Sequence, residues 1–438
     1  MINRFLFTKL MMALLWCNTL FAQNPKAETG VFALTNATLY TVTNGVIENG
    51  TLIIQDGKIF DMGTDSSIPA GAEVLNCQGL SVYPGLIDAG TQLGLKEIGS
   101  LQETRDESEL GEITPQMNAL TAINPNSVLI PVTRVAGVTT VLSTPSGGMF
   151  PGTAALINLH GYTPQQMFAG FKGVILNYPS SAKPWWDKRP EKEFDKEYKQ
   201  KIKRLTETWE KAVFYHTLDS AYQAAPSSAE KPSYFPEIAA LLPAVRGEEP
   251  LLVEVNKDSD ILKALAWVKQ HRIKAVFTGV KEGWRVADSL AAAKVPVITG
   301  PVLSTPSRGY DRYDKAYANA GLMKKAGVKV AIRTSEAENV RNLPYHAGFA
   351  AAYGLGKKEA LEAVTIVPAE IFGLAQEMGS LEKGKQATLF ITDGDPFETK
   401  TQVKQVFIKG WKVPLINRQT LLYDEFLERS DQVVSPTK

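Results

Sequence analysis

The two ends of the chain share one pattern, in which short apolar or alternating runs are separated by turn signals. Asn49-Gly50 and Asp56-Gly57 stand between runs near the amino end as hairpin signals. Neither end is long enough to form a sheet with a full core of its own. The pattern therefore predicts one small composite β-sandwich domain, built from residues 33–41, 51–55, 58–62, 387–391 and 403–408.

The middle of the chain alternates between strand and helix patterns. Short apolar runs suited to strands buried on both faces recur along it, with helical segments between several of them. This alternation predicts an α/β fold, a (β/α)8 TIM barrel, rather than an open doubly wound sheet. The strand candidates are residues 83–88, 138–143, 154–159, 174–178, 251–255, 275–278, 295–298 and 328–332.

These patterns divide the chain into five parts. Functional residues are expected at or just after the carboxyl ends of the barrel strands. The predicted parts are a signal peptide at 1–22, β-sandwich segments at 30–82 and 377–412, a barrel at 83–376 with an insertion at 180–233, and a carboxyl-terminal tail at 413–438.

The insertion at 180–233 does not follow the alternation. Trp185 and Trp186 precede a highly charged helix, predicted from about Glu191 to Phe214. An apolar stripe at helical spacing favours a helix packed on the barrel. A lid or a subunit interface is the alternative, because two adjacent Trp are costly to leave in water. The stripe consists of Ile202, Leu205, Trp209 and Val213.

Composition is ordinary for a globular protein and excludes several classes. Of the 438 residues, 44% are hydrophobic, and 47 Lys and Arg balance 46 Asp and Glu. Disorder would need fewer apolar residues, a disulfide scaffold would need more than 2 Cys, and a nucleic-acid binder would usually show a basic excess. We therefore expect no nucleic-acid partner. The 4 His are few for a hydrolytic zinc site.

The amino-terminal segment has the layout of a secretory signal peptide. Arg4 and Lys9 lead into the apolar run 10–16, and small Ala22 precedes a polar stretch. The run is shorter than the roughly 18 to 20 residues that span a bilayer, and no later segment is long and apolar enough. We therefore expect a secreted or periplasmic protein with no membrane span, in which Cys77 is the remaining thiol.

Four short motifs follow one another along the chain: YPGLID at 83–88, GVTTV at 137–141, TIVPA at 365–369 and GSLEKGKQA at 379–387. Together they resemble the amidohydrolase superfamily, in its imidazolonepropionase-like branch. The resemblance covers roughly residues 30–412. It implies a metal-dependent (β/α)8 barrel beside a composite β-sandwich, and hydrolysis of C–N bonds other than peptide bonds.

The metal-ligand positions that the resemblance implies do not hold metal ligands. Active members carry His-x-His directly after the P-G-[LF]-[IV]-D segment, where this chain has Gly90 and Gln92. Glycine has no side chain, and a neutral amide is a poor ligand for Zn²⁺. Glu254, Thr278 and Ser335 occupy the later positions, after the fifth, sixth and eighth strands. We therefore expect no metal and no other cofactor, although active members use Zn²⁺, and we assign no catalytic residue.

The histidines do not rebuild this site in an obvious way. No two of them stand at metal-ligand spacing, so a surface or capping role is favoured for each. A rebuilt mononuclear site, with Glu254, Glu336 or Asp88 beside His346, is the alternative. The four are His160, His216, His271 and His346.

Even without a metal, the barrel mouth can bind a small molecule through polar side chains. Arg333 could hold a carboxylate in a fork geometry, although each candidate can equally belong to a structural network. The candidate contacts are Arg105, Arg333, Glu336, Asn342 and His346.

Three functions remain open. The first is a metal-free pseudoenzyme that acts as a binding or partner subunit, in a homo-oligomer or beside an active paralogue. The second is an active amidohydrolase that cleaves a cyclic amide or a small peptide through a rearranged, mononuclear site. The third is a structural assembly protein that uses Trp185 and Trp186 as contacts. No residue pattern names a substrate.

Overall fold

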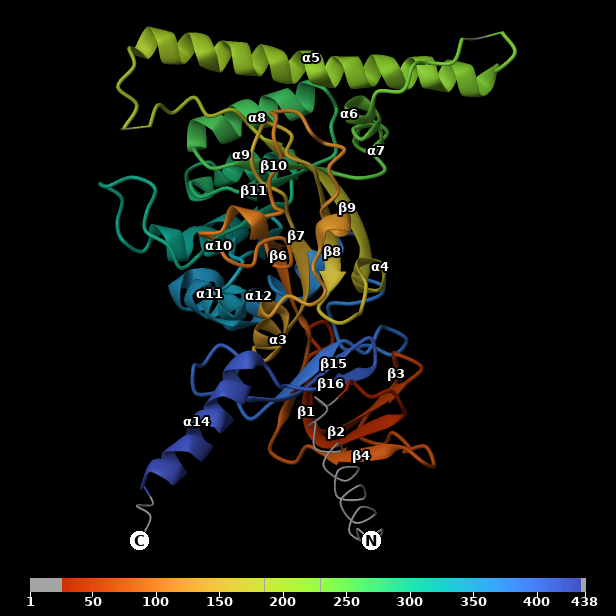
Figure 1. The fold of residues 1–438 in the computed structure, drawn as a ribbon. Helices are drawn as coiled ribbons and strands as arrows, with labels where there is room; N and C mark the ends of the chain where they lie inside the picture. Colours follow the sequence, from red (N-terminus) through yellow and green to blue (C-terminus); the bar gives the residue numbers. More distant parts are fainter. Residues whose placement is uncertain (1–25, 185, 229, 435–438) are drawn as a thin grey trace, which may run out of the picture.

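The computed structural model describes residues 26–184, 186–228 and 230–434. It consists of a β-rich end and a barrel, with a long helix across the far side of the barrel (Figure 1). The predicted signal peptide and Trp185 lie outside the described residues. Within the described part of the chain, no helix combines the length and the apolar character needed to cross a bilayer.

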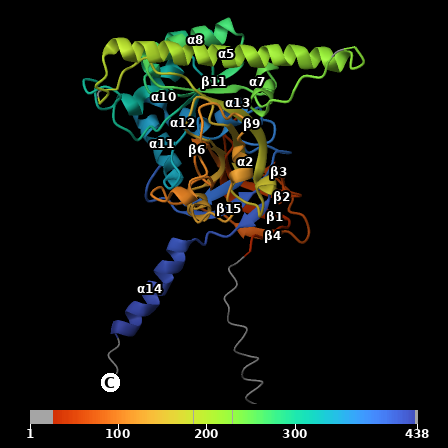
Figure 2. The same cartoon turned by 45° about the horizontal axis from the view of Figure 1, so that its top comes forward.

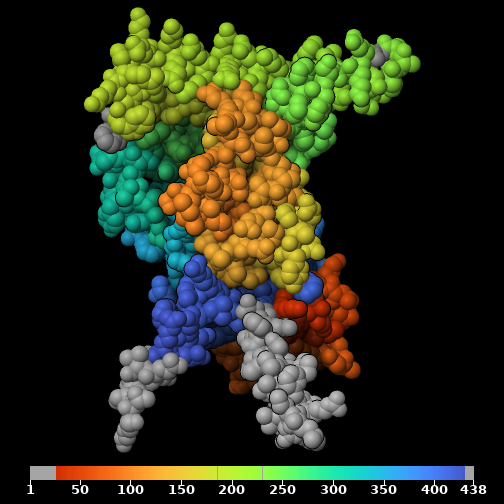
Figure 3. All heavy atoms as spheres, in the orientation of Figure 1, coloured from red at the N-terminus to blue at the C-terminus, as the bar shows by residue number. Residues whose placement is uncertain are grey.

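The β-rich end is built from both ends of the chain, as predicted. Strand β14 pairs antiparallel with β5, so the carboxyl-terminal strands continue the sheet of the amino-terminal ones. In the space-filling view the red and blue segments accordingly adjoin at one end of the molecule (Figure 3). The order is β16-β15-β14-β5-β1-β2-β3, with β4 beside β1. The strands are β1 (Phe32–Tyr40), β2 (Val46–Gln55), β3 (Lys58–Gly63), β4 (Glu73–Asn76), β5 (Ser81–Pro84), β14 (Leu389–Thr392), β15 (Val403–Ile408) and β16 (Trp411–Val413).

This sheet curls back on itself around its own core. Lys58, at the start of the edge strand β3, forms a β-bridge with Gln386 just before β14. Phe32 of β1 packs edge-on against Phe407 of β15, with ring centroids 5.2 Å apart, although β5 and β14 lie between these strands in the sheet. The curl supplies the two-layered packing expected of a sandwich. Cys77 is buried in this core.

One hairpin prediction in this domain was wrong. Asn49-Gly50 does not join two strands but lies within β2, where Asn49 adopts a φ of 51° beside a register shift between β1 and β2. A Cβ on Gly50 would lie 2.8 Å from Leu39 Cδ1, so close packing explains this glycine better than a turn does. Asp56-Gly57 does form the predicted turn, between β2 and β3.

Eight strands form the barrel sheet, in the order in which they follow along the chain. All eight apolar runs of the middle segment became strands of this sheet. At the mouth, the Ser335 N–H donates to Gly90 O at 3.0 Å, which joins the last strand to the first. The strands are β6 (Leu86–Thr91), β7 (Val138–Ser143), β8 (Thr153–Asn158), β9 (Phe168–Asn177), β10 (Leu251–Val255), β11 (Ala275–Gly279), β12 (Val297–Thr299) and β13 (Val330–Ile332).

The predicted run 83–88 is divided between the two sheets. Tyr83 and Pro84 belong to β5 of the curled sheet, and β6 of the barrel begins at Leu86. Gly85 lies between them, and a Cβ there would stand 2.1 Å from Thr139 Oγ1. The change from one sheet to the other therefore needs a residue without a side chain at this point.

The third barrel strand departs from the strict (β/α)8 pattern. Strand β8 pairs antiparallel with both β7 and β9, whereas the other neighbouring pairs are parallel. Its amino end therefore lies at the barrel mouth. His160, just after its carboxyl end, lies at the opposite end of the barrel, near Trp411 of β16.

Helices surround the barrel and extend beyond it. Helix α14 projects from the body, away from both domains (Figures 1 and 2), in the segment predicted as a tail. The helices are α2 (Ala119–Ala122), α3 (Leu129–Arg134), α4 (Pro164–Met167), α5 (Glu191–Ala224), α6 (Pro236–Ala239), α7 (Leu242–Val245), α8 (Asp258–Gln270), α9 (Ala287–Ala293), α10 (Lys315–Lys325), α11 (Leu343–Ala350), α12 (Lys357–Glu362), α13 (Ile366–Ile371) and α14 (Arg418–Val434).

The charged insertion forms one long helix, α5, that packs on the barrel helix α8. It starts at Glu191 as predicted but continues ten residues past the predicted end, to Ala224. Leu205 and Trp209 are buried, and the ring of Trp209 meets that of Trp267 at 5.9 Å. Val213 was predicted in the packing stripe and is exposed instead, because the buried side of the helix continues from Trp209 to Ala212 and leaves Val213 turned outward.

Candidate functional site at the barrel mouth

A cavity of about 190 Å³ opens at the carboxyl ends of the barrel strands. It brings together the five residues that stand at the metal-ligand positions implied by the family resemblance, here called the inherited positions, and also Arg333. These come from segments as far apart as the first and last barrel strands. The predicted residues that line it are Gly90, Gln92, Glu254, Thr278, Arg333 and Ser335.

A partly buried ion pair crosses this cavity. Arg333 Nη2 lies 2.7 Å from Glu254 Oε2 and also donates to Glu254 Oε1 at 2.9 Å. The Arg333 side chain is 12% exposed and that of Glu254 26%. Two contacts from one guanidinium nitrogen at this burial hold both side chains in place, unlike a typical surface pair.

Neighbouring polar groups keep the Glu254 carboxylate charged. Burial alone would raise its pKa, but the charge of Arg333 and hydrogen bonds from Thr278, Asn256 and Arg333 together lower the pKa below its usual value. Thr278 Oγ1 donates at 2.8 Å and Asn256 Nδ2 at 3.1 Å. Gly279 follows at a φ of 81°, and a Cβ there would stand 2.5 Å from Glu254 Oε1.

The space beside Gly90 is filled by Arg333. A Cβ built on Gly90 would lie 2.8 Å from Arg333 Cδ and 3.6 Å from its Nη1. An imidazole at this position, as in active family members, could not coexist with the arginine side chain as it lies here. The absence of a side chain at Gly90 therefore makes room for the Arg333 side chain.

This donor set does not fit a bound divalent metal ion. Gly90 offers no ligand, Gln92 offers an amide, and the one carboxylate among the inherited positions, Glu254, already binds a guanidinium. In the part of the chain that the structure describes, no three His, Cys, Asp or Glu side chains stand together as a metal site would require. Arg333 brings a fixed positive charge to the place where active relatives are expected to bind Zn²⁺.

Asp88, the last residue of the YPGLID motif, is fully buried beneath the cavity. It accepts hydrogen bonds from the Gly90 N–H at 3.0 Å and from both the N–H and the hydroxyl of Thr334. Burial raises its pKa to about 7, although these hydrogen bonds and Arg333 act in the opposite direction. Asp88 therefore ties the first barrel strand to the segment that carries Arg333.

Four of the five predicted ligand contacts do not line this cavity. Arg105 forms an ion pair with Glu107 at 2.8 Å in the loop after β6, and Asn342 lines a different cavity, between the barrel and the β domain. Glu336 reaches the site through its backbone, where its carbonyl accepts from the Gln92 N–H at 3.0 Å. Of the five predicted ligand contacts, only Arg333 lines the mouth cavity.

His346 has a structural role in the loop after β12. It is buried, and its Nδ1 accepts a hydrogen bond from the Val302 N–H at 3.1 Å. Burial lowers its pKa to about 4, so the ring is neutral near pH 7. His160 lies at the far end of the barrel, and among the described residues that line the mouth cavity there is no histidine.

Sequence reasoning missed several polar residues of the cavity. Thr144 and Ser146 follow β7, and Asn177 ends β9. Asn256, one residue past β10, holds Glu254. Each stands at or within three residues of the carboxyl end of a predicted strand, and this was the signal that could have identified them.

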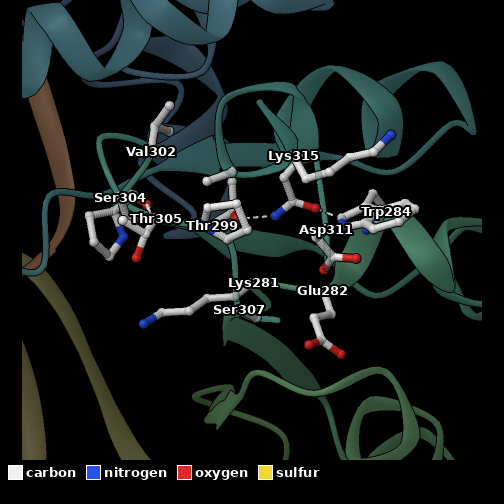
Figure 4. Close-up of a pocket in the computed structure, with 15 residues that line it drawn as sticks. Lys281, Glu282, Trp284, Thr299, Val302, Ser304, Thr305, Ser307, Asp311 and Lys315 are labelled. Carbon is white, nitrogen blue, oxygen red and sulfur yellow. Dashed lines mark hydrogen bonds between the residues drawn. The ribbon is translucent and has the colours of Figure 1, made fainter. Parts of the chain in front are cut away.

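A second hollow near the mouth is too small for a ligand. It lies between the loop after β12 and α10, and about 20 Å³ of it is open, which is room for roughly one water. Thr299 and Trp284 stand on two sides of it (Figure 4). Asn319 bridges them, donating to Thr299 Oγ1 at 3.0 Å and accepting from the Trp284 N–H at 2.9 Å. These contacts fix the wall of the barrel mouth.

The fold and the site define a class: a (β/α)8-type barrel with a composite β domain, whose mouth carries an arginine–glutamate pair in place of metal ligands. A family model described as "Amidohydrolase family" matches residues 264–413. A crystal structure of an amidohydrolase from Thermotoga maritima superposes with a TM-score of 0.76 at 23% identity, over 88% of this chain and 100% of that one.

Curated relatives agree with this class. An imidazolonepropionase from Sphingopyxis alaskensis is 24% identical over 83% of this chain and 92% of its own length, and one from Mesorhizobium japonicum is 37% identical over 75 residues. Amidohydrolase tasK from Hapsidospora irregularis is 22% identical over 407 residues, and the chain spans only 39% of its length. Together these likenesses support the amidohydrolase superfamily, and within it the imidazolonepropionase-like branch.

Proposed function

We propose that this chain is a metal-free amidohydrolase-fold protein that acts as a binding or partner subunit. The observation that carries the proposal is the position of Arg333, whose side chain fills the space beside Gly90 and binds Glu254. A permanent cation at this place opposes the binding of a second cation through charge repulsion. The space next to residue 90, where the family resemblance implies a metal-binding histidine, is taken by the Arg333 side chain.

Loss of the metal removes the chemistry that the family uses. A bound Zn²⁺ lowers the pKa of water from 15.7 to about 7 and polarises the carbonyl under attack. Arg333 can polarise a carbonyl but cannot generate hydroxide. Asp88 is buried below the cavity and engaged with Gly90 and Thr334, so it does not replace that function. Hydrolysis of the family type is therefore expected to be absent.

The cavity retains features of a binding site for a small polar molecule. Its 190 Å³ suits a ligand smaller than a typical drug. The buried Arg333 Nε has no hydrogen-bond partner among the residues that the structure describes, and neither has Asn256 Oδ1. Since buried polar atoms are normally paired, these two support a ligand or water that accepts from Arg333 Nε and one that donates to Asn256 Oδ1.

Metal analysis of the purified mature protein tests the proposal. The chain is expected to hold far less than one equivalent of Zn²⁺ or Mn²⁺ after exposure to excess metal and desalting. It should also be inactive on a panel of cyclic amides and dipeptides. One tightly bound ion per chain, with an activity that a chelator removes, would instead support the alternative of an active enzyme with a rearranged, mononuclear site.

Glu254→Gln separates these two outcomes further. An enzyme whose metal is held by Glu254 loses both metal and activity in this variant. For a metal-free protein the variant changes neither metal content nor activity, and only weakens the pairing with Arg333. Lys203→Gln, on the exposed face of α5, is the matched surface control.

We also propose that the protein is secreted or periplasmic, on the strength of Arg4, Lys9 and the apolar run before Ala22. Cell fractionation with amino-terminal sequencing tests this. A mature chain that begins near residue 23 in the periplasm or medium is expected. An intact chain that starts at Met1 and remains in the cytoplasm would contradict it.

A partner subunit, either a second copy or an active paralogue, belongs to the same proposal. Trp186 is 65% exposed just before α5, and Phe214, within that helix, is 64% exposed. Light scattering of the wild type and of Trp185→Ser/Trp186→Ser tests whether these residues form contacts, as a purely structural role would require. An unchanged mass would remove that third function.

A further inference from the structure

A cavity larger than the one at the barrel mouth lies where the barrel meets the β domain, far from that mouth. It measures about 640 Å³, within the range of small-molecule sites, which often lie at domain junctions. Its walls come from the turn after β1, from helix α12 and from the loop between β14 and β15. The residues that carry the argument are Tyr40, Val42, Val46, Lys357, Lys358 and Phe397.

An aromatic ladder runs across the sheet into this cavity. Phe390 of β14, Tyr83 of β5 and Tyr40 of β1 lie on three neighbouring strands. The rings of Phe390 and Tyr83 stack at 5.6 Å and those of Tyr83 and Tyr40 at 4.4 Å, nearly parallel in the second pair. Phe390 and Tyr83 are buried, whereas Tyr40 is only partly buried and lines the cavity.

The next place in the ladder is occupied by a small residue. Tyr40 pairs with Val46 of β2 across the strands, so Val46 stands where a fourth ring would continue the stack. Val46 is 49% exposed and also lines the cavity. A planar ring placed over it would meet the Tyr40 ring and remain inside the cavity walls.

The wall beside this place has a strained backbone. Val42 adopts a φ of 75°, which a β-branched residue rarely does. Hydrogen bonds hold the turn around it: Thr41 N–H and Oγ1 both donate to Gly45 O, at 3.0 and 2.8 Å. Such strain persists only where surrounding structure imposes it, and it is common at ligand clamps.

The rim has an excess of positive charge. Lys357 and Lys358 at the start of α12 both line the cavity, and Asp395 is the one carboxylate among its lining residues. Lys357 pairs with Asp395 at 2.8 Å, whereas the one ion pair of Lys358 with a described residue is a loose contact of 3.8 Å with Glu362. An ammonium group therefore remains for an acidic group on a ligand.

We propose that this junction cavity is a second small-molecule site, which takes a planar aromatic ring bearing an acidic group. The ring lies against Tyr40 over Val46, and the acidic group faces Lys358. The site does not depend on the barrel mouth or on any metal.

Isothermal titration calorimetry of the purified mature chain with 2-naphthoate tests this proposal. Saturable binding at one site is expected. Val46→Trp places a ring in the empty position and should weaken binding by about tenfold or more, whereas Val46→Ala, the matched control, should change it by less than about threefold. Melting temperatures of both variants show whether each remains folded.

Two further titrations test the role of charge. Lys358→Glu should bind 2-naphthoate about tenfold more weakly, and the wild type should bind the neutral analogue 2-naphthamide about tenfold more weakly than 2-naphthoate. Cyclohexanecarboxylate, which has the acid without the planar ring, should not bind. Ser335→Ala at the barrel mouth should leave 2-naphthoate binding unchanged. The proposal is overturned if no saturable binding occurs, if Val46→Trp binds like the wild type, or if Ser335→Ala rather than Val46→Trp abolishes binding.

Discussion

The barrel mouth and the domain junction each hold an ion pair of nearly the same length, in very different surroundings. Arg333 and Glu254 lie 2.7 Å apart with side chains 12% and 26% exposed, and Lys357 and Asp395 lie 2.8 Å apart with side chains 75% and 29% exposed. At the mouth the cationic partner is buried and fills the space beside Gly90. At the junction it stands in water beside a larger cavity. Distance alone therefore does not tell which pair shapes its site.

The comparison indicates that the two cavities are held open in different ways. The mouth is held by an internal network in which each group depends on the next, so changes there should alter stability. The junction has a strained turn and half-exposed lining residues, so changes there should alter binding more than stability. Substitutions in the two regions test this difference.

Arg333→Ala should give the largest effect. It leaves the Glu254 carboxylate partly buried with only Thr278 and Asn256 as donors, and removal of one partner of a buried pair costs about 3 kcal/mol. Urea denaturation measures the free energy of unfolding. Lys203→Ala, which breaks an exposed pair on α5, should cost less than about 0.5 kcal/mol. Equal losses in the two variants would contradict the role given to burial.

Asp88→Asn should remove a pH dependence that the wild type shows. The folded-state pKa of Asp88 is raised to about 7, so its contribution to stability is complete below pH 4 and is lost as the pH rises toward 7. The slope is at most about 1.4 kcal/mol per pH unit, so the loss of stability between pH 4 and pH 7 is at most about 4 kcal/mol.

His346 acts in the opposite direction over an overlapping range. Its folded-state pKa is lowered to about 4, so its contribution is present above pH 6.5 and is lost as the pH falls. The difference in unfolding free energy between the wild type and Asp88→Asn at each pH isolates the aspartate. A difference that does not change between pH 4 and 7 would show that Asp88 is ionised throughout.

Gly90→Ala tests the claim that Arg333 fills the place of a metal ligand. The new Cβ would stand 2.8 Å from Arg333 Cδ, and overpacking of this kind costs about 1 to 2 kcal/mol. In the Arg333→Ala background the same change should cost almost nothing, because the clash is gone. Additive losses in the double variant would separate the glycine from the arginine.

The elements of this fold were largely readable from sequence, but the filling of the site was not. Each of the eight predicted runs forms a barrel strand, because a short apolar run between polar segments is typical of a strand that is buried on both faces. The direction of β8 was missed, since a strand buried on both faces carries no sign of whether its neighbours run parallel or antiparallel. The reversal places His160, which follows this strand, at the end of the barrel opposite the mouth.

The candidate site was half predicted. The YPGLID motif placed Gly90 and Gln92 by counting residues, and the structure brings both to the mouth cavity. Their replacement was interpreted as a simple loss. That Arg333 occupies the space depends on a contact between the first and last barrel strands, which no local pattern encodes. Asn342 and His346 were expected at the mouth, but both lie past the eighth strand at points where the chain has already left the mouth.

Lys357→Ala should have the smallest effect and completes the comparison with Arg333→Ala. Its ammonium is exposed, and Asp395 keeps a hydrogen bond from the Phe397 N–H at 2.9 Å when the lysine is gone. The loss should stay below about 0.5 kcal/mol and shrink further in 1 M NaCl, because salt screens exposed pairs. Urea denaturation at low and high salt measures both quantities. A loss near that of Arg333→Ala would mean that the junction is held as firmly as the mouth, and that its open walls are not a sign of a binding site.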